Sequence, residues 1–218
     1  MRISDNPVHL AGKPLNHACH ACAFFHTDEE KYRVLLPFIL EGVERGDLAT
    51  HIVNPAQRAA HLARLAQAGV DTDAAQAQGQ LAVYTWDETY LQDGRFDQQR
   101  MIATLLALIA PTNAPPGKIS RNIADMAWSP GARPEGYEIV EYEARLNQVL
   151  PDYHHPIVCT YDLTHFSADV VIDILRTHPM VIIGGILQEN PFFVPPAAML
   201  KELDARRLAG ATPASAAR

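Results

Sequence analysis

The chain has 218 residues, 48% of them hydrophobic, which is enough to bury one sizeable core and fits one large domain better than two small ones. Eighteen Lys and Arg residues stand against 25 Asp and Glu residues, a formal net charge of −7 with no basic stripe, which argues against direct nucleic-acid binding. No stretch approaches the ~20 apolar residues of a membrane-spanning helix, and the N-terminal residues contain no apolar signal segment. Three cysteines are too few for a disulfide framework. We therefore expect a cytoplasmic protein with reduced thiols and no membrane partner.

The first half of the chain alternates between strand-like and helix-like patterns. Residues 19–25 predict a strand and residues 27–46 an amphipathic helix, with Thr27 as its N-cap and Glu30 in the capping-box position. Pro37 falls inside this helix and predicts a kink or a break near its middle. The pattern continues with a strand over 47–53, a helix over 55–69 and a strand over 80–86.

The second half keeps the same rhythm. It predicts helices over 96–110, 137–150 and 167–178, and strands over 118–128, 156–163 and 180–187. Six strands alternating with about five helices indicate an α/β fold of three layers, in which helices cover both faces of a mostly parallel sheet. We expect one domain over 17–204, between a polar leader over 1–16 and a flexible tail or linker over 205–218.

A ligand site is expected beyond the carboxyl ends of the strands, because loops and helix N-termini converge there in open parallel sheets. The residues that follow the predicted strands are mostly aromatic or polar: His26, Asn54, Trp86, Glu88, Tyr90, Asp125, Met126, Trp128, Asp162, His165, Glu189, Asn190 and Phe192. They describe a pocket for a small, partly apolar ligand better than one for a highly charged substrate. Packing of Trp86, Met126 and Trp128 over the core explains these large side chains equally well.

Motifs of nucleotide and acyl chemistry are absent from the sequence. The phosphate-binding pattern G-x-x-x-x-G-K-[ST] fails at Gly117-Lys118, which lacks the upstream glycine and is followed by Ile119, and no G-x-G-x-x-G occurs. Gly184-Gly185 indicates a turn or close packing. No G-x-S-x-G elbow is present. Cys159 lies in an apolar strand, where cysteine usually acts as a small hydrophobe, so a Cys-dependent hydrolase is only a second alternative.

Residues 17–22 read HACHAC and concentrate metal-ligand side chains. His17, Cys19, His20 and Cys22 are all ligand types for zinc or a similar ion, so a sensor that binds a metal ion or haem through this segment is an alternative function. In an extended strand, however, His17 and Cys19 share one face while His20 and Cys22 share the other. Four ligands would converge only if the chain turned here. A smaller set is more plausible, with His20 and Cys22 in one layer and a third ligand from a distant segment.

Several segments together resemble the MEDS domain, the sensory domain named for methanogens, methylotrophs and the dichloromethane regulator DcmR. The matching segments are HACAFFHTDEEKYRVLLPFILEGVERGD, GVDTDAAQAQGQLAVYTWDETYLQDGRFD, IADMAW, EIVEYEARLN, VCTYDLTHF and HPMVIIGGILQENPFF. They cover residues 17–196 in unbroken order. No single motif is specific, but their order and spacing together are.

The resemblance implies a RecA/KaiC-like architecture without the phosphate loop and a ligand-sensing, non-enzymatic role. It implies a small ligand, a hydrocarbon derivative or one-carbon compound, and an output partner that is a histidine kinase, an anti-sigma factor or a transcription regulator. The family's motifs map onto His20 and Cys22, Asp125 and Trp128, Tyr142 and Glu143, and Cys159, Tyr161 and Asp162.

The candidate ligand-binding residues are accordingly His20, Cys22, Asp125, Trp128, Glu143, Cys159 and Tyr161. For Asp125 and Glu143, an ion pair with Arg121 or Arg145 explains the carboxylates about as well as a ligand role. The apolar segment PFFVPPAAML could contact a second subunit or an output domain, so a homodimer is a further expectation.

Overall fold

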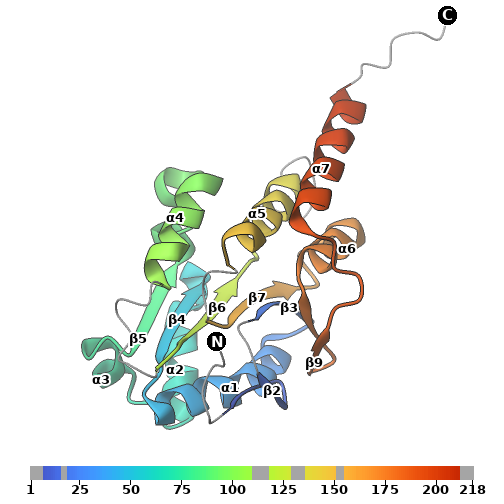
Figure 1. The fold of residues 1–218 in the computed structure, drawn as a ribbon. Coiled ribbons are helices and arrows are strands. Elements are labelled where there is room, and N and C mark those ends of the chain that lie inside the picture. The colour runs from blue at the N-terminus through green and yellow to red at the C-terminus, as the bar shows by residue number, and fades with distance from the viewer. Residues whose placement is uncertain (1–6, 16–18, 110–117, 129–135, 151–154, 212–218) are drawn as a thin grey trace, which may run out of the picture.

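A seven-stranded, mostly parallel sheet forms the centre of the molecule (Figure 1). The computed structural model describes residues 7–15, 19–109, 118–128, 136–150 and 155–211. The strand order is β5-β4-β6-β7-β3-β8-β9, and only the β8–β9 pair of this sheet is antiparallel. The expected α/β fold with a mostly parallel sheet is confirmed.

The first unit of the sheet shows how local sequence sets the elements. All six residues of β3 (His20–Phe25) are buried, as expected for a central strand between two helical layers. Helix α1 (Asp28–Arg45) begins where the Thr27 side chain accepts a hydrogen bond from the Glu30 backbone N–H, and it ends at Gly46 in the left-handed conformation. The helix runs through Pro37 without interruption, so the expected break does not occur.

The remaining elements follow in the predicted alternation. They are β4 (Leu48–Val53), α2 (Arg58–Gln67), α3 (Thr72–Ala77), β5 (Leu81–Thr85), α4 (Gln98–Leu108), β6 (Ser120–Asp125), α5 (Gly136–Val149), β7 (Ile157–Asp162), α6 (Ala168–Thr177), β8 (Met180–Ile183), β9 (Ile186–Glu189) and α7 (Pro196–Ala211). Three short 3-10 segments, η1 (Pro55–Gln57), η2 (Trp86–Glu88) and η3 (Gln92–Gly94), lie in the loops.

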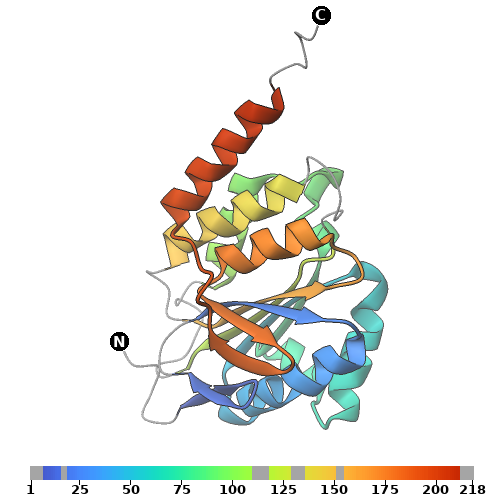
Figure 2. The ribbon, with the colours of Figure 1, turned by 90° about the vertical axis from the view of Figure 1, so that its right-hand side faces the viewer.

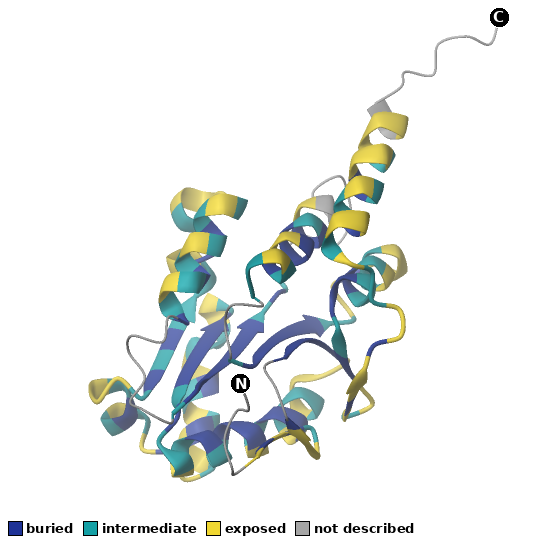
Figure 3. Cartoon of the chain, viewed as in Figure 1, coloured by how far each residue is buried: buried dark blue, intermediate teal, exposed yellow. Residues whose placement is uncertain are grey.

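Each face of the sheet carries its own hydrophobic core, and the burial is concentrated in the strands (Figure 3). On β3, Ala21 and Ala23 pack with α1 to α3, whereas Cys22 and Phe24 pack with α4 to α7. Successive side chains of a strand point to opposite faces, which gives this division. Helices therefore cover both faces, as expected (Figure 2).

Two described segments near the chain ends, at 8–15 and 205–211, have regular structure that was not expected, while residues 1–6, 16 and 212–218 lie outside the described residues. Part of the predicted polar leader forms an antiparallel hairpin of β1 (Val8–Leu10) and β2 (Lys13–Leu15) against α1. Helix α7 continues through residues 205–211, where a frayed end or linker was expected. There, Arg206 pairs with Asp173 of α6.

The last predicted strand is a hairpin of two, which adds the seventh strand to the sheet. Gly184 and Gly185 have φ values of 60° and 78° and form the two-residue turn between β8 and β9. The turn expected at these glycines is confirmed. In the part of the chain that the structure describes, no helix is long and apolar enough to cross a membrane.

Candidate functional site

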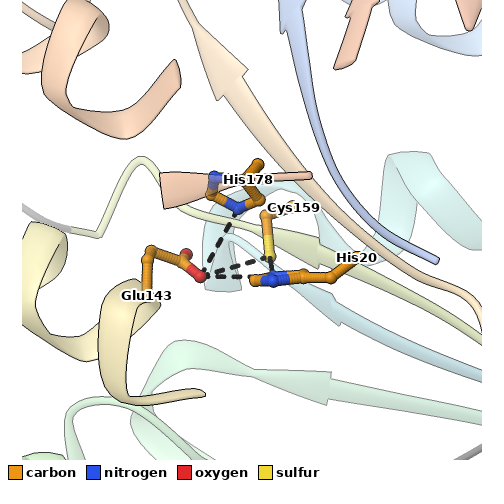
Figure 4. Close-up of side chains that lie close together, drawn as sticks. All are labelled: His20, Glu143, Cys159 and His178. Carbon is orange, nitrogen blue, oxygen red and sulfur yellow. Dashed lines mark hydrogen bonds and ion pairs between the residues drawn. The ribbon is translucent and has the colours of Figure 1, made fainter. Parts of the chain in front are cut away.

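Four ligand-type side chains from distant segments meet on the sheet face that α5 and α6 cover (Figure 4). His20 is the first residue of β3, Cys159 lies in neighbouring β7, Glu143 lies in α5 and His178 joins α6 to β8. None of the four is more than 5% exposed. We call these residues the buried cluster.

The distances within the buried cluster centre on one carboxylate oxygen. Glu143 Oε2 lies 3.3 Å from His20 Nε2, 3.5 Å from His178 Nε2 and 4.0 Å from Cys159 Sγ. His20 Nε2 and Cys159 Sγ are 3.4 Å apart. The imidazole rings of His20 and His178 also lie side by side, with centroids 4.3 Å apart.

A surrounding set of hydrogen bonds fixes each member. Asn147 donates to the backbone carbonyls of Glu143 and Thr177, which turns its Oδ1 toward His20 Nδ1 at 3.0 Å. His178 Nδ1 lies 2.8 Å from the Ile174 carbonyl oxygen. Tyr161 donates its hydroxyl proton to Glu143 Oε1 at 2.6 Å. The second oxygen of Glu143 therefore remains directed at the histidines and the cysteine.

Burial and the two histidines set the protonation of the buried cluster. Burial alone would raise the pKa of Glu143, but the charge and hydrogen bonds of His178 and His20 outweigh it and hold this pKa below the usual range. Burial, reinforced by His20 and opposed by Glu143, lowers the pKa of His178. Burial and then Glu143 raise the pKa of the Cys159 thiol. The carboxylate is thus the charged form that this environment favours.

A separate pocket of about 250 Å³ opens at the carboxyl ends of the strands. Most of its lining is polar: Phe25, Thr27, Asp28, Lys31, Asn54, Gln57, Trp86, Asp125, Ala127, Thr160, Tyr161, Asp162 and His165. We call it the carboxyl-end pocket. It lies where loops after β3, β4, β5, β6 and β7 converge, the position at which open parallel sheets bind ligands.

Lys31 is the cation of the carboxyl-end pocket. Its ammonium group lies 2.8 Å from Asp28 and 3.7 Å from Asp125, so it joins the first turns of α1 to the end of β6. Burial raises the pKa of Asp125, and Lys31 opposes that shift. The indole N–H of Trp86 donates to the Asp125 carbonyl at 3.0 Å, which holds this aromatic wall in place.

The loop between β3 and α1 cannot act as a phosphate loop. It consists of His26 and Thr27, whereas the phosphate-binding motif needs eight residues with two glycines. A helix N-terminus normally attracts phosphate groups. The first turn of α1, however, carries Asp28, Glu29 and Glu30, and their negative charges repel a polyphosphate from this N-terminus.

The sequence profile of the family described as the methanogen/methylotroph, DcmR sensory domain, MEDS, matches residues 19–179. The chain belongs to the MEDS family. The matched region begins just before β3 and ends just after α6, so it contains the whole buried cluster and the carboxyl-end pocket. Membership supports a signal-sensing, regulatory role.

One related protein and one solved structure of similar fold place this MEDS domain among known proteins. It is 23% identical over 171 residues to the transcriptional repressor DcmR of Methylorubrum extorquens strain DM4, covering 78% of this chain and 61% of that protein. The chain therefore spans about three fifths of the repressor's length. A crystal structure of a KaiC-like protein from Pyrococcus horikoshii OT3 has a TM-score of 0.57 at 14% identity, over 83% of this chain and 80% of that one. This likeness confirms the expected RecA/KaiC-like architecture.

The structure of the MEDS domain brings only part of the predicted ligand-binding set together. His20, Glu143, Cys159 and Tyr161 meet in or beside the buried cluster. Cys22 shares their face of the sheet, but its thiol donates to the Met180 carbonyl at 3.7 Å.

Asp125 and Trp128 lie apart from that cluster. Asp125 lines the carboxyl-end pocket. Trp128 stacks on Tyr90 with centroids 4.8 Å apart and packs against Phe96, which matches the core-packing alternative.

The structure does not assemble the metal set predicted from residues 17–22. Cys19 packs in the core under α1, on the face of β3 opposite to His20. His17 lies outside the described residues. The alternation expected for an extended strand thus separates Cys19 from His20, and among the described residues of this segment only His20 joins a group of metal-ligand type.

The expected ion pairs with Arg121 and Arg145 do not form. Asp125 pairs with Lys31, and Glu143 faces two histidines. Arg121 instead binds Asp47.

Three important residues escaped the sequence analysis. All three lie in segments that resemble the MEDS domain, but the resemblance gave none of them a role: His178 follows a helix, Asn147 lies on an amphipathic helix, and Lys31 stands among surface-type charges. The resemblance named the Glu143 region, and Asn147 is one helical turn later on the same face. That spacing, within a segment that resembles the MEDS domain, was the available signal for Asn147.

Proposed function

We propose that this chain is the sensory module of a transcription-regulatory system, and that it binds a small organic molecule with a polar group in the carboxyl-end pocket. Family membership supports the sensory part of the proposal. The name of the related repressor supports a transcription regulator as the output, in preference to a histidine kinase or an anti-sigma factor. The carboxyl-end pocket supports the place of binding.

The composition of this pocket is the observation that carries the proposal. A cavity of about 250 Å³ is near the small end of ligand sites, so it suits a compound of few heavy atoms. Lys31, Asn54 and Gln57 offer donors to a polar group, while Trp86 and Phe25 offer apolar surface. A functionalised one-carbon or short-chain compound, such as an alcohol, amine or carboxylate, matches this lining better than an unsubstituted hydrocarbon.

Ligand binding at Lys31 provides a route to a conformational change. A ligand oxygen that accepts a hydrogen bond from the ammonium group competes with Asp28, on the same helix, and with Asp125, whose pairing with Lys31 joins α1 to the end of β6. The ligand then favours a different position of the first turns of α1. A sensor requires such a preference, because a ligand shifts the equilibrium between two conformations only when it binds one of them more tightly than the other.

A thermal-shift screen of small alcohols, amines, carboxylates and halogenated one-carbon compounds tests this proposal. A compound at 100 times its dissociation constant stabilises the folded state by about 2.7 kcal/mol, which for a chain of this size raises the melting temperature by roughly 5–10 °C. We expect Lys31→Met to abolish the shift given by a hit compound. Lys201→Met, at an exposed position of α7, is the matched control and should keep it. Equal shifts in both variants would contradict binding in this pocket.

The Cys-dependent hydrolase receives no support from the geometry. Cys159 is 2% exposed, and its raised pKa keeps it in the unreactive thiol form. A nucleophile needs access to substrate and a thiolate at neutral pH. Neither condition is met at this position.

A further inference from the structure

We propose that the buried cluster of His20, Glu143, Cys159 and His178 is a binding site for one zinc ion. This site is distinct from the carboxyl-end pocket and goes beyond the proposed ligand binding. Its four ligand atoms come from β3, α5, β7 and the loop after α6, and they lie within 4.8 Å of one another. A zinc ion here would tie both central strands to the two helices above them.

The spacing of the ligand atoms matches a tetrahedral site. Zinc binds imidazole nitrogen and carboxylate oxygen at roughly 2.0–2.2 Å and thiolate sulfur at about 2.3 Å, so neighbouring ligand atoms in a tetrahedron lie about 3.3–3.6 Å apart. Three observed pairs fall in or at this range: His20 to Glu143 at 3.3 Å, His20 to Cys159 at 3.4 Å and His178 to Glu143 at 3.5 Å. The Cys159 to Glu143 pair at 4.0 Å, and any of the remaining pairs that lie near the 4.8 Å limit of the cluster, must contract when the ion binds.

Both histidines present the correct nitrogen to the centre of the cluster. The Ile174 carbonyl accepts a hydrogen bond and cannot donate one, so His178 Nδ1 must carry a proton. The Asn147 amide nitrogen is used by two carbonyls, so its oxygen faces His20 Nδ1, which must carry a proton as well. With Nδ1 protonated, Nε2 is the nitrogen of each ring that is left to bind a metal ion, which would displace any proton there. Metal-binding histidines are normally fixed by such a bond from the other nitrogen.

An unpartnered buried atom points to a missing ligand. His178 Nε2 is fully buried, and among the residues that the structure describes it makes no hydrogen bond of normal geometry; its one polar contact there is the ion pair with Glu143. Its distance of 3.5 Å to Glu143 Oε2 is long for a charge-assisted hydrogen bond, which is typically about 2.7–2.9 Å. The single thiol proton of Cys159 can satisfy His20 but not His178 as well. A cation between these atoms would satisfy all of them.

Charge balance supports a divalent ion. A Cys159 thiolate and a Glu143 carboxylate together carry two negative charges, which neutralise Zn²⁺ in a site without water. The Tyr161 hydroxyl holds the other Glu143 oxygen, so the carboxylate would bind through Oε2 alone. The donor set of two imidazoles, one thiolate and one carboxylate suits zinc, which accepts nitrogen, sulfur and oxygen ligands.

The first test is metal analysis of the full chain purified without chelator, followed by removal of metal and titration with Zn²⁺ and Co²⁺. We expect one zinc ion per chain, recovery of zinc by the metal-free protein, and a thiolate-to-metal charge-transfer band with Co²⁺. Cys159→Ser should remove this band and weaken zinc binding by more than about 100-fold, because loss of a direct ligand exceeds the 10- to 100-fold effect of outer-shell changes.

Matched variants separate this site from the other cysteines and histidines. Cys19→Ser and Cys22→Ser remove buried thiols outside the cluster, and His61→Gln alters a buried histidine on the opposite face of the sheet. All three should keep the zinc and the cobalt band. Circular dichroism of the metal-free variants shows whether each is folded.

Three results would overturn the proposal. Wild-type protein that takes up neither zinc nor cobalt when folded would show that the four side chains form a structural ion pair only. A cobalt spectrum without a charge-transfer band would show that Cys159 is not a ligand, a result that does not depend on any variant folding. Loss of binding in Cys19→Ser or Cys22→Ser, with binding kept in Cys159→Ser, would place the metal at residues 17–22 instead.

Discussion

Loss of the hydrogen bond from Tyr161 to Glu143 should lower the stability of the protein by a predictable amount. Tyr161→Phe deletes a donor 2.6 Å from Glu143 Oε1 in a place where both residues are fully buried. A hydrogen bond to a charged group contributes about 1.5–3 kcal/mol, and its loss leaves a buried carboxylate oxygen without a partner. For a chain of this size the melting temperature should fall by roughly 3–12 °C.

Tyr142→Phe is the matched control for this measurement. Tyr142 is equally buried, but its hydroxyl, near that of Tyr90, has no hydrogen-bond partner of good geometry within the described ranges. Urea unfolding should therefore show a lower midpoint at unchanged slope for Tyr161→Phe, and a change below about 1 kcal/mol for Tyr142→Phe. In a Glu143→Gln background the cost of Tyr161→Phe should shrink. Equal losses in the two single variants would refute the assigned role of the Tyr161 hydroxyl.

Three further predictions concern acid stability, thiol reactivity and helix packing. Burial and then the Lys31 charge lower the pKa of His61 from 6.5 to about 4. As the pH falls, the unfolded chain therefore takes up a proton at His61 before the folded chain does, and the free energy of unfolding falls by about 3 kcal/mol between pH 6.5 and 4. Urea midpoints measured over this pH range should fall less steeply in His61→Gln, and an equally steep fall would contradict the assignment. Because burial raises the pKa of Cys159, iodoacetamide should modify it only after denaturation, and rapid labelling of the native chain, followed by mass spectrometry, would refute its burial. Gly42→Ala places a methyl group about 2.6 Å from Arg121 Cδ. This overlap should lower the free energy of unfolding by about 1–3 kcal/mol, despite the better helix propensity of alanine. A gain in stability measured by calorimetry would show instead that Arg121 moves freely.

The sequence predicted the layers of the fold because each depends on a local pattern. The buried run of β3, the N-cap of α1 at Thr27 and the strand–helix alternation are all found as expected. The errors arose where tertiary contacts or turn geometry decide. Gly184-Gly185 reverses the chain within what was predicted as one strand, and the break that was one of two outcomes expected at Pro37 does not occur.

The candidate sites were predictable only in part, because local patterns fix some of their residues and tertiary contacts fix the others. Strand alternation correctly separated Cys19 from His20, because it is a local property. The carboxyl-end rule selected Asn54, Trp86 and Asp125, which the structure places in one pocket.

The partners of His20 depend on which helix covers which strand. His178 reaches His20 through the β3–β8 pairing, and Asn147 reaches it from α5. No local pattern in the sequence encodes these contacts.

We have proposed that the chain senses a small molecule at the carboxyl ends of its strands. The most direct test is to titrate the isotope-labelled protein with a hit compound from the screen and to follow the backbone amide signals by NMR. We predict that the largest shifts lie at the start of α1, in η1 and η2, and at the ends of β6 and β7, which line the carboxyl-end pocket. Shifts concentrated in α5 and α6, with the start of α1 unchanged, would contradict the account.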